Sequence, residues 1–413
     1  MTLAEQIIAR NTNDNNAKAG DIVMVKPDSL MIHDIFIPFV VQKFHEMGFT
    51  KIYNPDITAI IYDHLVPASK TEDIRHYKIG DSFAREQNIT RLHKSDGVCH
   101  QLMCEKGYIL PGQLAFGTDS HTVTYGALGA FATGLGYTDM AAILGTGETW
   151  IKIPEAIKIR IDGDLPKGVC AKDVILKIIA DLKADGATYK SLEFVGTAVE
   201  KMSISSRLTI SNMAVEAGAK AGLFFPDEKT CHYCGVSPEI INQFIHCEDN
   251  QYAKVLSYHG EDFVPVVAMP SNVDHVKPVS EIGKIDLDQV FIGSCTNGRL
   301  EDIQTAAEIL ENHKIKDGLR LIVTPASRDI YQKAAQKGYL SILAEAGAII
   351  THPGCGLCCG RSGGIVCDGE RVLATNNRNF LGRMGSPNAE IFLSSPSVAA
   401  YSSINGFISA SFA

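Results

Sequence analysis

The chain has 413 residues, of which 45% are apolar and 21% charged, a composition typical of globular proteins with room for two or three domains. Its formal net charge of −9 argues against nucleic acid or an anionic membrane as the default partner. The sequence shows neither a secretory leader nor a run of about 18 apolar residues, so we expect a cytoplasmic protein whose 11 cysteines stay reduced.

Short β-branched runs alternate with longer stretches of helical period, which predicts an α/β fold with mainly parallel sheets. In chain order, the pattern predicts helices over 2–10 and 38–47, strands over 58–64 and 113–119, helices over 171–184 and 206–220, a strand over 289–295, a helix over 300–312, and strands over 321–325, 346–352 and 371–377. Proline and glycine interrupt this pattern near 152–168 and 268–283. We therefore expect three domains, over 1–152, 153–275 and 276–413.

Most of the predicted strands run into unusual polar loops. The loops read YDH (Asp63, His64), GTDSHT (Asp119, Ser120, His121), GSCTNGR (Cys295, Asn297, Arg299), HPGCGLCCG and NNRNFLGR. Loops are polar in most proteins, but open α/β sheets bind ligands at the carboxyl ends of their strands. The recurrence of such clusters in five loops therefore favours one composite site.

Cys355 and Cys358 form a Cys-x-x-Cys pair that suits zinc, an iron-sulfur cluster or a redox couple. A redox pair usually opens a helix, and the many glycines of GCGLCCGRSGG disfavour a helix start. Cys295 ends a strand in the same predicted domain. Three thiolates from two strand ends would ligate three irons of a four-iron cluster and leave the fourth iron open as a Lewis acid.

A second pair, Cys231 and Cys234 in CHYC, is the alternative metal site, with His232 and Cys247 as further candidate zinc ligands. No histidine pair or other Cys-x-x-Cys follows at the usual zinc-site spacing, so we interpret these residues as incidental or core cysteines. The same interpretation applies to the remaining cysteines, Cys99, Cys104, Cys170, Cys359 and Cys367.

Seven motifs occur in order across residues 63–383: YDH, GVCHQ, FGTDSHT, SNMAVEAGA, GSCTNGR, GCGLCCG and NNRNFLGR. Together they resemble the aconitase superfamily of iron-sulfur hydro-lyases. The resemblance implies three α/β/α domains around a central 4Fe-4S cluster, without the swivelling fourth domain. The length resembles the large subunits of the two-subunit branch, which includes isopropylmalate isomerase, homoaconitase and dimethylmalate or citramalate dehydratase. We therefore expect a small subunit to supply the missing domain.

The resemblance also implies roles for individual residues around the cluster. The implied cluster ligands are Cys295, Cys355 and Cys358, and the residues near the cluster are Asn297 and Asn377. Arg378 and Arg383 would bind substrate carboxylates, which suits the planar fork of an arginine. His33 would lie near the substrate, where single-chain aconitases carry a glutamine.

The remaining motifs resemble the family's acid and base groups. The implied catalytic residues are Asp63, His64, His100, Asp119, His121 and Glu216, with Ser120 and Asn212 near the substrate. His64 would protonate the departing hydroxyl, because a neighbouring carboxylate keeps a histidine oriented and more basic. His100 would pair with Asp119 and His121 with Glu216. Asn212 and Glu216 are four residues apart, so we expect them to share one helix face.

The expected activity is the dehydration and rehydration of a hydroxy di- or tricarboxylic acid, first of all 3-isopropylmalate of leucine biosynthesis. Dimethylmalate, citramalate and homoaconitate enzymes share the same motifs and stay open as alternatives. No residue of the chain suggests the base that removes the proton from carbon, which in the family is a serine beside an arginine on the mobile domain. An iron-responsive RNA-binding sensor is a remote alternative, disfavoured by the acidic charge and the absence of interleaved basic and aromatic residues.

Overall fold

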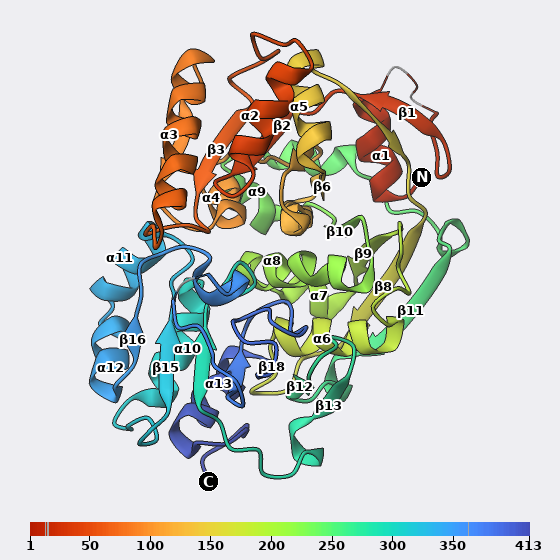
Figure 1. The fold of residues 1–413 in the computed structure, drawn as a ribbon. Coiled ribbons are helices and arrows are strands. Elements are labelled where there is room, and N and C mark those ends of the chain that lie inside the picture. Colours follow the sequence, from red (N-terminus) through yellow and green to blue (C-terminus); the bar gives the residue numbers. More distant parts are fainter. Residues whose placement is uncertain (13, 15, 362) are drawn as a thin grey trace.

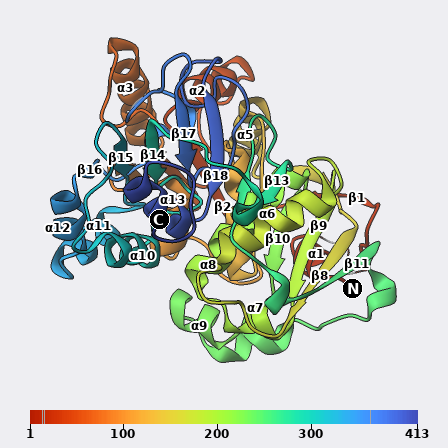
Figure 2. The same cartoon turned by 90° about the horizontal axis from the view of Figure 1, so that it is seen from below.

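In a computed structural model that describes residues 1–12, 14, 16–361 and 363–413, the strands form four sheets with helices packed against them (Figure 1). The predicted helices and strands are confirmed, with ends that differ by a few residues and one break described below. The N-terminal segment lies at the top of Figure 1, above the yellow-green middle segment and the blue C-terminal segment. Seen from below, α10–α12 and β8–β10 lie on opposite sides of the molecule (Figure 2).

The N-terminal sheet has five parallel strands in the order β4-β3-β2-β5-β6. Its strands are β2 (Ser29–His33), β3 (Thr58–Tyr62), β4 (Arg91–Lys94), β5 (Leu114–Gly117) and β6 (Phe131–Gly134). The helices of this region are α1 (Leu3–Arg10), α2 (Ile37–Glu46), α3 (Thr71–Glu86), α4 (Cys99–Glu105) and α5 (Tyr137–Thr146). The strands β1 (Ile22–Val25) and β7 (Thr149–Lys152) pair as an antiparallel ribbon. Because β2, β3 and β5 are neighbours and parallel, the residues after them meet at one edge.

The middle sheet has four parallel strands in the order β10-β9-β8-β11. The strands are β8 (Ala156–Asp162), β9 (Ser191–Val195), β10 (Ala221–Phe224) and β11 (Lys254–His259). The associated helices are α6 (Ala171–Leu182), α7 (Thr197–Lys201), α8 (Ile204–Met213) and α9 (Glu228–Cys234). Apolar residues of these strands, among them Ile159 of β8 and Phe194 of β9, belong to a buried core that also includes Ile175 of α6.

The third sheet has the order β13-β12-β18-β17-β14-β15-β16, parallel from β18 to β16 and antiparallel at the β12 and β13 edge. The strands are β12 (Val266–Ala268), β13 (Val276–Pro278), β14 (Gln289–Ile292), β15 (Arg320–Val323), β16 (Ile349–Ile350), β17 (Arg371–Ala374) and β18 (Glu390–Ser394). The helices are α10 (Leu300–Leu310), α11 (Arg328–Gln336), α12 (Tyr339–Ala346) and α13 (Pro396–Asn405). Cys295, Cys355 and Asn377 follow β14, β16 and β17.

Short 3-10 helices connect these elements. They are η1 (Ser120–Leu128), η2 (Ala214–Ala217), η3 (Pro238–Gln243), η4 (Asp249–Gln251), η5 (Gly260–Asp262), η6 (Val279–Glu281) and η7 (Gly356–Cys359). One of them corrects the sequence prediction: α8 ends at Met213, and Glu216 lies in η2. The prediction that Asn212 and Glu216 share one helix face is therefore wrong, because the chain tightens into a 3-10 turn that Gly218, at φ +85°, closes.

The expected domain boundaries at 152/153 and 275/276 stay predictions. One apolar core joins the middle and third sheets, since Ile159 of β8, Ile175 of α6 and Val372 of β17 belong to the same buried cluster. In the part of the chain that the structure describes, none of the helices is both long and apolar enough to cross a membrane.

Candidate active site

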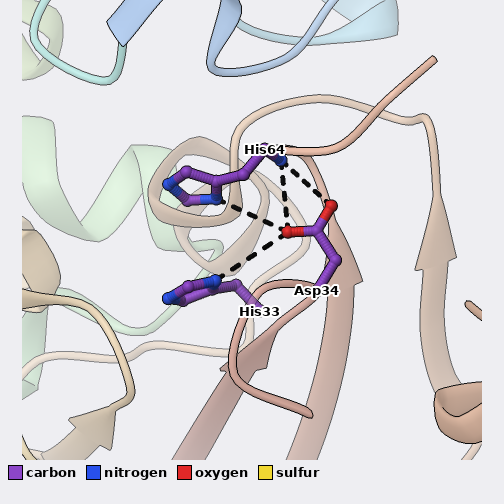
Figure 3. Close-up of side chains that lie close together, drawn as sticks. All are labelled: His33, Asp34 and His64. Atoms are coloured by element: carbon purple, nitrogen blue, oxygen red, sulfur yellow. Dashed lines mark hydrogen bonds and ion pairs between the residues drawn. The ribbon is translucent and has the colours of Figure 1, made fainter. Parts of the chain in front are cut away.

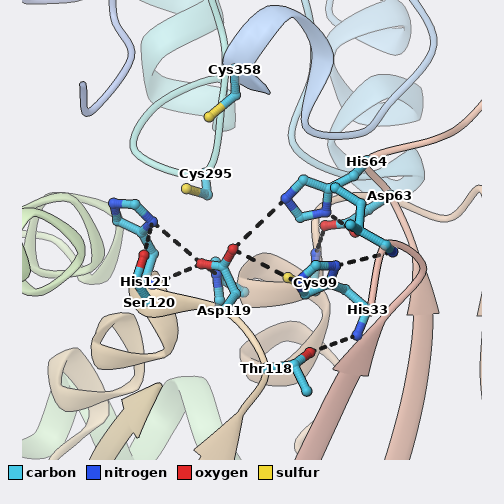
Figure 4. Close-up of polar contacts among 12 residues, drawn as sticks. His33, Asp63, His64, Cys99, Thr118, Asp119, Ser120, His121, Cys295 and Cys358 are labelled. Carbon is cyan, nitrogen blue, oxygen red and sulfur yellow. Dashed lines mark hydrogen bonds and ion pairs between the residues drawn. The ribbon is translucent and has the colours of Figure 1, made fainter. Parts of the chain in front are cut away.

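Two buried cysteines, Cys295 and Cys358, face a group of histidines and carboxylates from the N-terminal sheet (Figure 4). Most of the acid and base residues come from the ends of β2, β3 and β5, but His100 lies in α4 and Glu216 in η2. Cys295 and Cys358 come from the loops after β14 and β16. In Figure 4 the two sulfur atoms lie on one side of the group, and His121, Asp119 and His64 lie below them. Residues predicted from loops far apart in the chain therefore occupy one region.

Asp63 and His64, the first predicted pair, form a buried contact of 2.7 Å between Asp63 Oδ1 and His64 Nδ1. The other Asp63 oxygen accepts the backbone N–H of Cys99 at 2.7 Å, which fixes the carboxylate. Burial alone would lower the pKa of His64, but the charge and hydrogen bond of Asp63, together with the charge of Asp34, outweigh burial and raise that pKa well above its ordinary value. The pair therefore has the geometry of an oriented acid.

Asp119 lies at the centre of four imidazoles. Its Oδ1 lies 2.9 Å from His100 Nε2 and 3.3 Å from His121 Nδ1. Its Oδ2 lies 3.9 Å from His64 Nε2 and 4.0 Å from His33 Nε2. Although burial opposes ionisation, the hydrogen bonds from His100 and His121 hold the pKa of Asp119 well below its ordinary value. The structure thus confirms the expected pairing of His100 with Asp119.

His121 is also paired with Glu216, as expected, at 2.8 Å between Nε2 and Oε1. The same carboxylate oxygen accepts the Arg378 Nε–H at 2.8 Å, and Arg378 Nη2 donates to the Ser120 hydroxyl at 3.1 Å. Burial disfavours the His121 imidazolium, but hydrogen bonds to Asp119 and Glu216 raise its pKa overall. Glu216 therefore accepts hydrogen bonds from both His121, a predicted catalytic residue, and Arg378, a predicted substrate-binding residue.

The ring centroids of His33 and His64 lie 4.5 Å apart with the ring planes tilted by 35°, and Asp34 lies beside both (Figure 3). These three residues have the spacing of a single-ion site, but the Asp34 carboxylate already accepts the backbone N–H groups of Asp63, His64 and Leu65. The His33 Nδ1 accepts the Ile35 N–H at 3.3 Å, so a neutral ring carries its proton on Nε2. That buried nitrogen has no hydrogen-bond partner among the described residues.

The three predicted cluster cysteines gather in one buried group with Val98. Burial raises the pKa of Cys295 to about 12. The thiol of Cys355 donates a hydrogen bond to Cys358, which lowers the pKa of Cys358 well below its ordinary value. Among the described residues, the three sulfurs do not all lie within 4.8 Å of one another, as the ligands of one tetrahedral ion would.

Several N–H groups point at these sulfurs. Asn212 Nδ2 and Asn377 Nδ2 each lie 3.2 Å from Cys295 Sγ, and Arg383 Nη2 lies 3.2 Å from Cys358 Sγ. Asn212 and Arg383, predicted near the substrate, therefore contact cysteines here. Asn297 was predicted near the cluster, yet its amide donates to Asp302 at 3.1 Å.

Sequence reasoning missed several buried residues that build this site. The Arg299 guanidinium donates to the carbonyls of Cys295 and Thr296, and Lys172 donates to those of Thr375 and Asn376. Asp34 holds the backbone of the YDH turn. Arg299 could have been found from its position in the GSCTNGR motif, and Asp34 from its position next to His33. No local sequence pattern distinguishes Lys172. The incidental role expected for Cys231, Cys234 and Cys247 stays a prediction.

Comparison with known proteins places the chain in a family. The model of the aconitase family (aconitate hydratase) matches residues 5–284 and 276–406. The chain is 46% identical over 409 residues to 3-isopropylmalate dehydratase large subunit 1 of Methanopyrus kandleri, covering 98% of each. It is 46% identical over 411 residues to 3-isopropylmalate dehydratase large subunit of Elusimicrobium minutum, covering 99% of this chain and 98% of that one.

A solved structure shows the same fold. The holo form of aconitase X from Thermococcus kodakaraensis matches 86% of this chain and 84% of its own with a TM-score of 0.50, at 13% sequence identity. This likeness confirms the predicted α/β fold, and the family match and the full-length relatives confirm the resemblance read from the seven motifs. On these grounds, the chain belongs to the aconitase family.

Proposed function

We propose that the chain is the large subunit of an iron-sulfur hydro-lyase that isomerises a hydroxy-dicarboxylic acid, with 3-isopropylmalate as the first candidate substrate. The names of full-length relatives at 46% identity support this substrate. The observation that carries the proposal is the position of three buried cysteines opposite an oriented Asp63–His64 pair.

The cysteines suit a 4Fe-4S cluster better than a single metal ion. They come from two loops, they are buried, and their sulfurs are too widely spread for one tetrahedral ion among the described residues. The N–H groups of Asn377 and Arg383 reach Cys295 and Cys358, and such donors stabilise thiolate ligands. When bound, a cluster held by three cysteines offers one open iron as a Lewis acid for a hydroxyl and a carboxylate.

His64 is the proton donor of the proposed reaction. Its raised pKa keeps the imidazole protonated at neutral pH, and Asp63 fixes the tautomer and the orientation of the ring. Among the residues that the structure describes, the nearest carboxylate to the His64 Nε2 atom is Asp119 at 3.9 Å, and no hydrogen bond holds this nitrogen, so its proton is free for a departing hydroxyl. Asp119, which His100 Nε2 contacts at 2.9 Å, is the carboxylate beside this nitrogen.

Arg378 holds a substrate carboxylate. Glu216 and Ser120 fix the guanidinium through Nε and one Nη2 donor, so the fork is oriented before substrate binds. Arg383 is the second carboxylate candidate, and its contact with Cys358 sets it at the edge of the cluster site. His33, whose ring lies beside that of His64, has an N–H without a partner among the described residues and donates it to the substrate.

The reaction also needs a base for the proton on the carbon next to the departing hydroxyl. We propose that a small subunit provides this base as a serine beside an arginine, on a domain that closes over the site. The words large subunit in the names of the relatives support such a partner. That partner also forms one wall of the pocket and so helps to set the length of the substrate.

A substrate panel tests the proposal. The chain is co-expressed with its small subunit, both are kept anaerobic, and the ultraviolet absorbance of the unsaturated intermediate is followed. The acids are 3-isopropylmalate, citramalate, 2,3-dimethylmalate, homocitrate and citrate. Turnover of 3-isopropylmalate well above the others supports the proposal as stated. If another acid is turned over faster, that acid takes the place of 3-isopropylmalate as the proposed substrate. If a preparation that contains iron and sulfide turns over none of the acids, the hydro-lyase proposal is overturned.

A further inference from the structure

Lys172 is a completely buried lysine behind the candidate active site. It lies in the first turn of α6, and its Nζ donates to the carbonyl oxygens of Thr375 and Asn376, at 2.6 Å each. Among the described residues, no carboxylate lies within 4.0 Å of this nitrogen. The two carbonyls, more than 200 residues away in the sequence, are therefore its direct partners.

Neither helix α6 nor the apolar core explains a lysine at this position. A cation in the first turn of a helix faces the positive end of the helix dipole, and a buried amine must give up its hydration. An apolar side chain of similar length would fill the same space without that cost. The lysine instead fixes the position of the two carbonyls that accept its hydrogen bonds.

These carbonyls belong to the turn that carries the site residues after β17. Thr375 is also bonded through its hydroxyl to Gly293 O at 3.0 Å, and its carbonyl accepts the Thr296 hydroxyl at 2.7 Å. The turn is thereby joined to the Cys295 loop. The next residues are Asn377, which donates to Cys295, and Arg378, which is held by Glu216.

We infer that Lys172 is a positioning residue, which holds the turn after β17 so that Asn377 and Arg378 face the site. The carbonyl of Asn376 lies one peptide unit before Asn377, so a shift of this turn moves the asparagine amide and the guanidinium together. Burial lowers the pKa of Lys172 to about 7. A neutral amine still has two N–H bonds for the two carbonyls, so the contact survives loss of the charge.

The inference rests on the proposed function only for its kinetic readout. Lys172→Met removes both hydrogen bonds and keeps most of the side-chain volume. The matched control is Lys158→Met, because Lys158 is also a buried lysine of the middle sheet but binds Asp249, away from the site. Both variants and the wild type are paired with the small subunit, and KM and kcat are measured separately for the accepted acid.

We expect KM to rise about tenfold in Lys172→Met, the effect of losing a charge-assisted hydrogen bond at Arg378. We expect a smaller change in kcat, and a KM close to that of the wild type for Lys158→Met. A KM within about twofold of the control overturns the inference. If Lys172→Met does not accumulate in folded form, Lys172→Leu, which also lacks an N–H donor for the two carbonyls, is held to the same KM criterion.

A second readout separates this inference from the proposed function. The chain is loaded with iron and sulfide, and the decay of its visible absorbance in air is followed for both variants. If the wild-type pair turns over no acid, the proposed function fails and this decay decides the inference. Because Lys172→Met should lose the contact of Asn377 with Cys295, we expect its visible absorbance to decay at least about threefold faster than that of Lys158→Met. Equal decay rates in the two variants overturn the inference.

Discussion

The Oδ1 atom of Asp63 lies 2.7 Å from Nδ1 of His64, and the backbone N–H of Cys99 holds the second oxygen of the same carboxylate. The carboxylate raises the pKa of the imidazole despite its burial. The proposed acid is therefore built into the turn after β3, before any substrate is present. Its charge state sets the pH range in which the chain can act.

The first prediction concerns this pair. A raised pKa keeps His64 protonated at neutral pH, so loss of its proton should lower turnover on the alkaline side, as pH passes that pKa. Asp63→Asn removes the charge that raises the pKa, and the alkaline limb of kcat/KM should move to lower pH. We also expect the rate to fall by about 10²-fold or more. Asp81→Asn, on α3 and bonded to Tyr62, serves as control and should leave the profile unchanged.

The second prediction distinguishes two adjacent cysteines. Cys358 lies in the buried cysteine group, whereas Cys359 is partly exposed and lies outside it. Cys358→Ser should lose most of the iron and sulfide after anaerobic loading, because serine is a poor ligand for a soft metal site. Cys359→Ser should retain both. Equal retention of iron by the two variants would contradict the assignment of the ligands.

The third prediction concerns the bond that orients Arg378. Glu216 accepts hydrogen bonds from Arg378 and His121 through the same oxygen, so Glu216→Gln weakens both contacts. A charge-assisted hydrogen bond is worth roughly 1.5–3 kcal/mol, which corresponds to an increase in KM of about tenfold or more. The control is Glu301→Gln, since Glu301 accepts from Ser203 at the surface. A KM equal to that of the control would show that Glu216 does not orient the arginine.

The fourth prediction concerns stability and Lys172. Its native pKa of about 7 lies below the value of about 10.4 for an unfolded lysine. Between these values the unfolded chain binds more protons, so this residue makes the free energy of unfolding rise with pH. From about pH 7.5 to about pH 9 the wild type should gain about 2 kcal/mol relative to Lys172→Met. Denaturant unfolding at the two pH values measures the free energy of unfolding of each protein. An equal change in the wild type and in Lys172→Met would contradict the prediction.

Residues at strand ends could be predicted from the sequence because a local pattern marks them. Asp63, Asp119 and Cys295 each follow a short apolar run, and the carboxyl ends of neighbouring parallel strands meet at one edge. The same reasoning identified Cys355 and Cys358 through their spacing. The family motifs then supplied roles that spacing alone left open.

The rest depends on contacts that no local pattern carries. Lys172 reads as an ordinary residue of a helical stretch, and only the folded chain brings it to the carbonyls of Thr375 and Asn376. The hydrogen bond from the Asn297 amide to Asp302 of α10 is another contact that the sequence did not predict, and the expected place of Asn297 near the cluster stays a prediction. The break after α8 was missed because a 3-10 turn continues the helical period for a few residues.

The central claim is that this chain holds the cluster, the acid and a carboxylate site, and that the carbon base comes from a partner. The most direct test measures the ultraviolet absorbance of the unsaturated intermediate with 3-isopropylmalate, for the pure iron-loaded chain alone and after addition of the small subunit. We predict no turnover by the chain alone and turnover once the small subunit is added. Isomerisation by the chain alone would contradict the account, because the base would then lie in this chain.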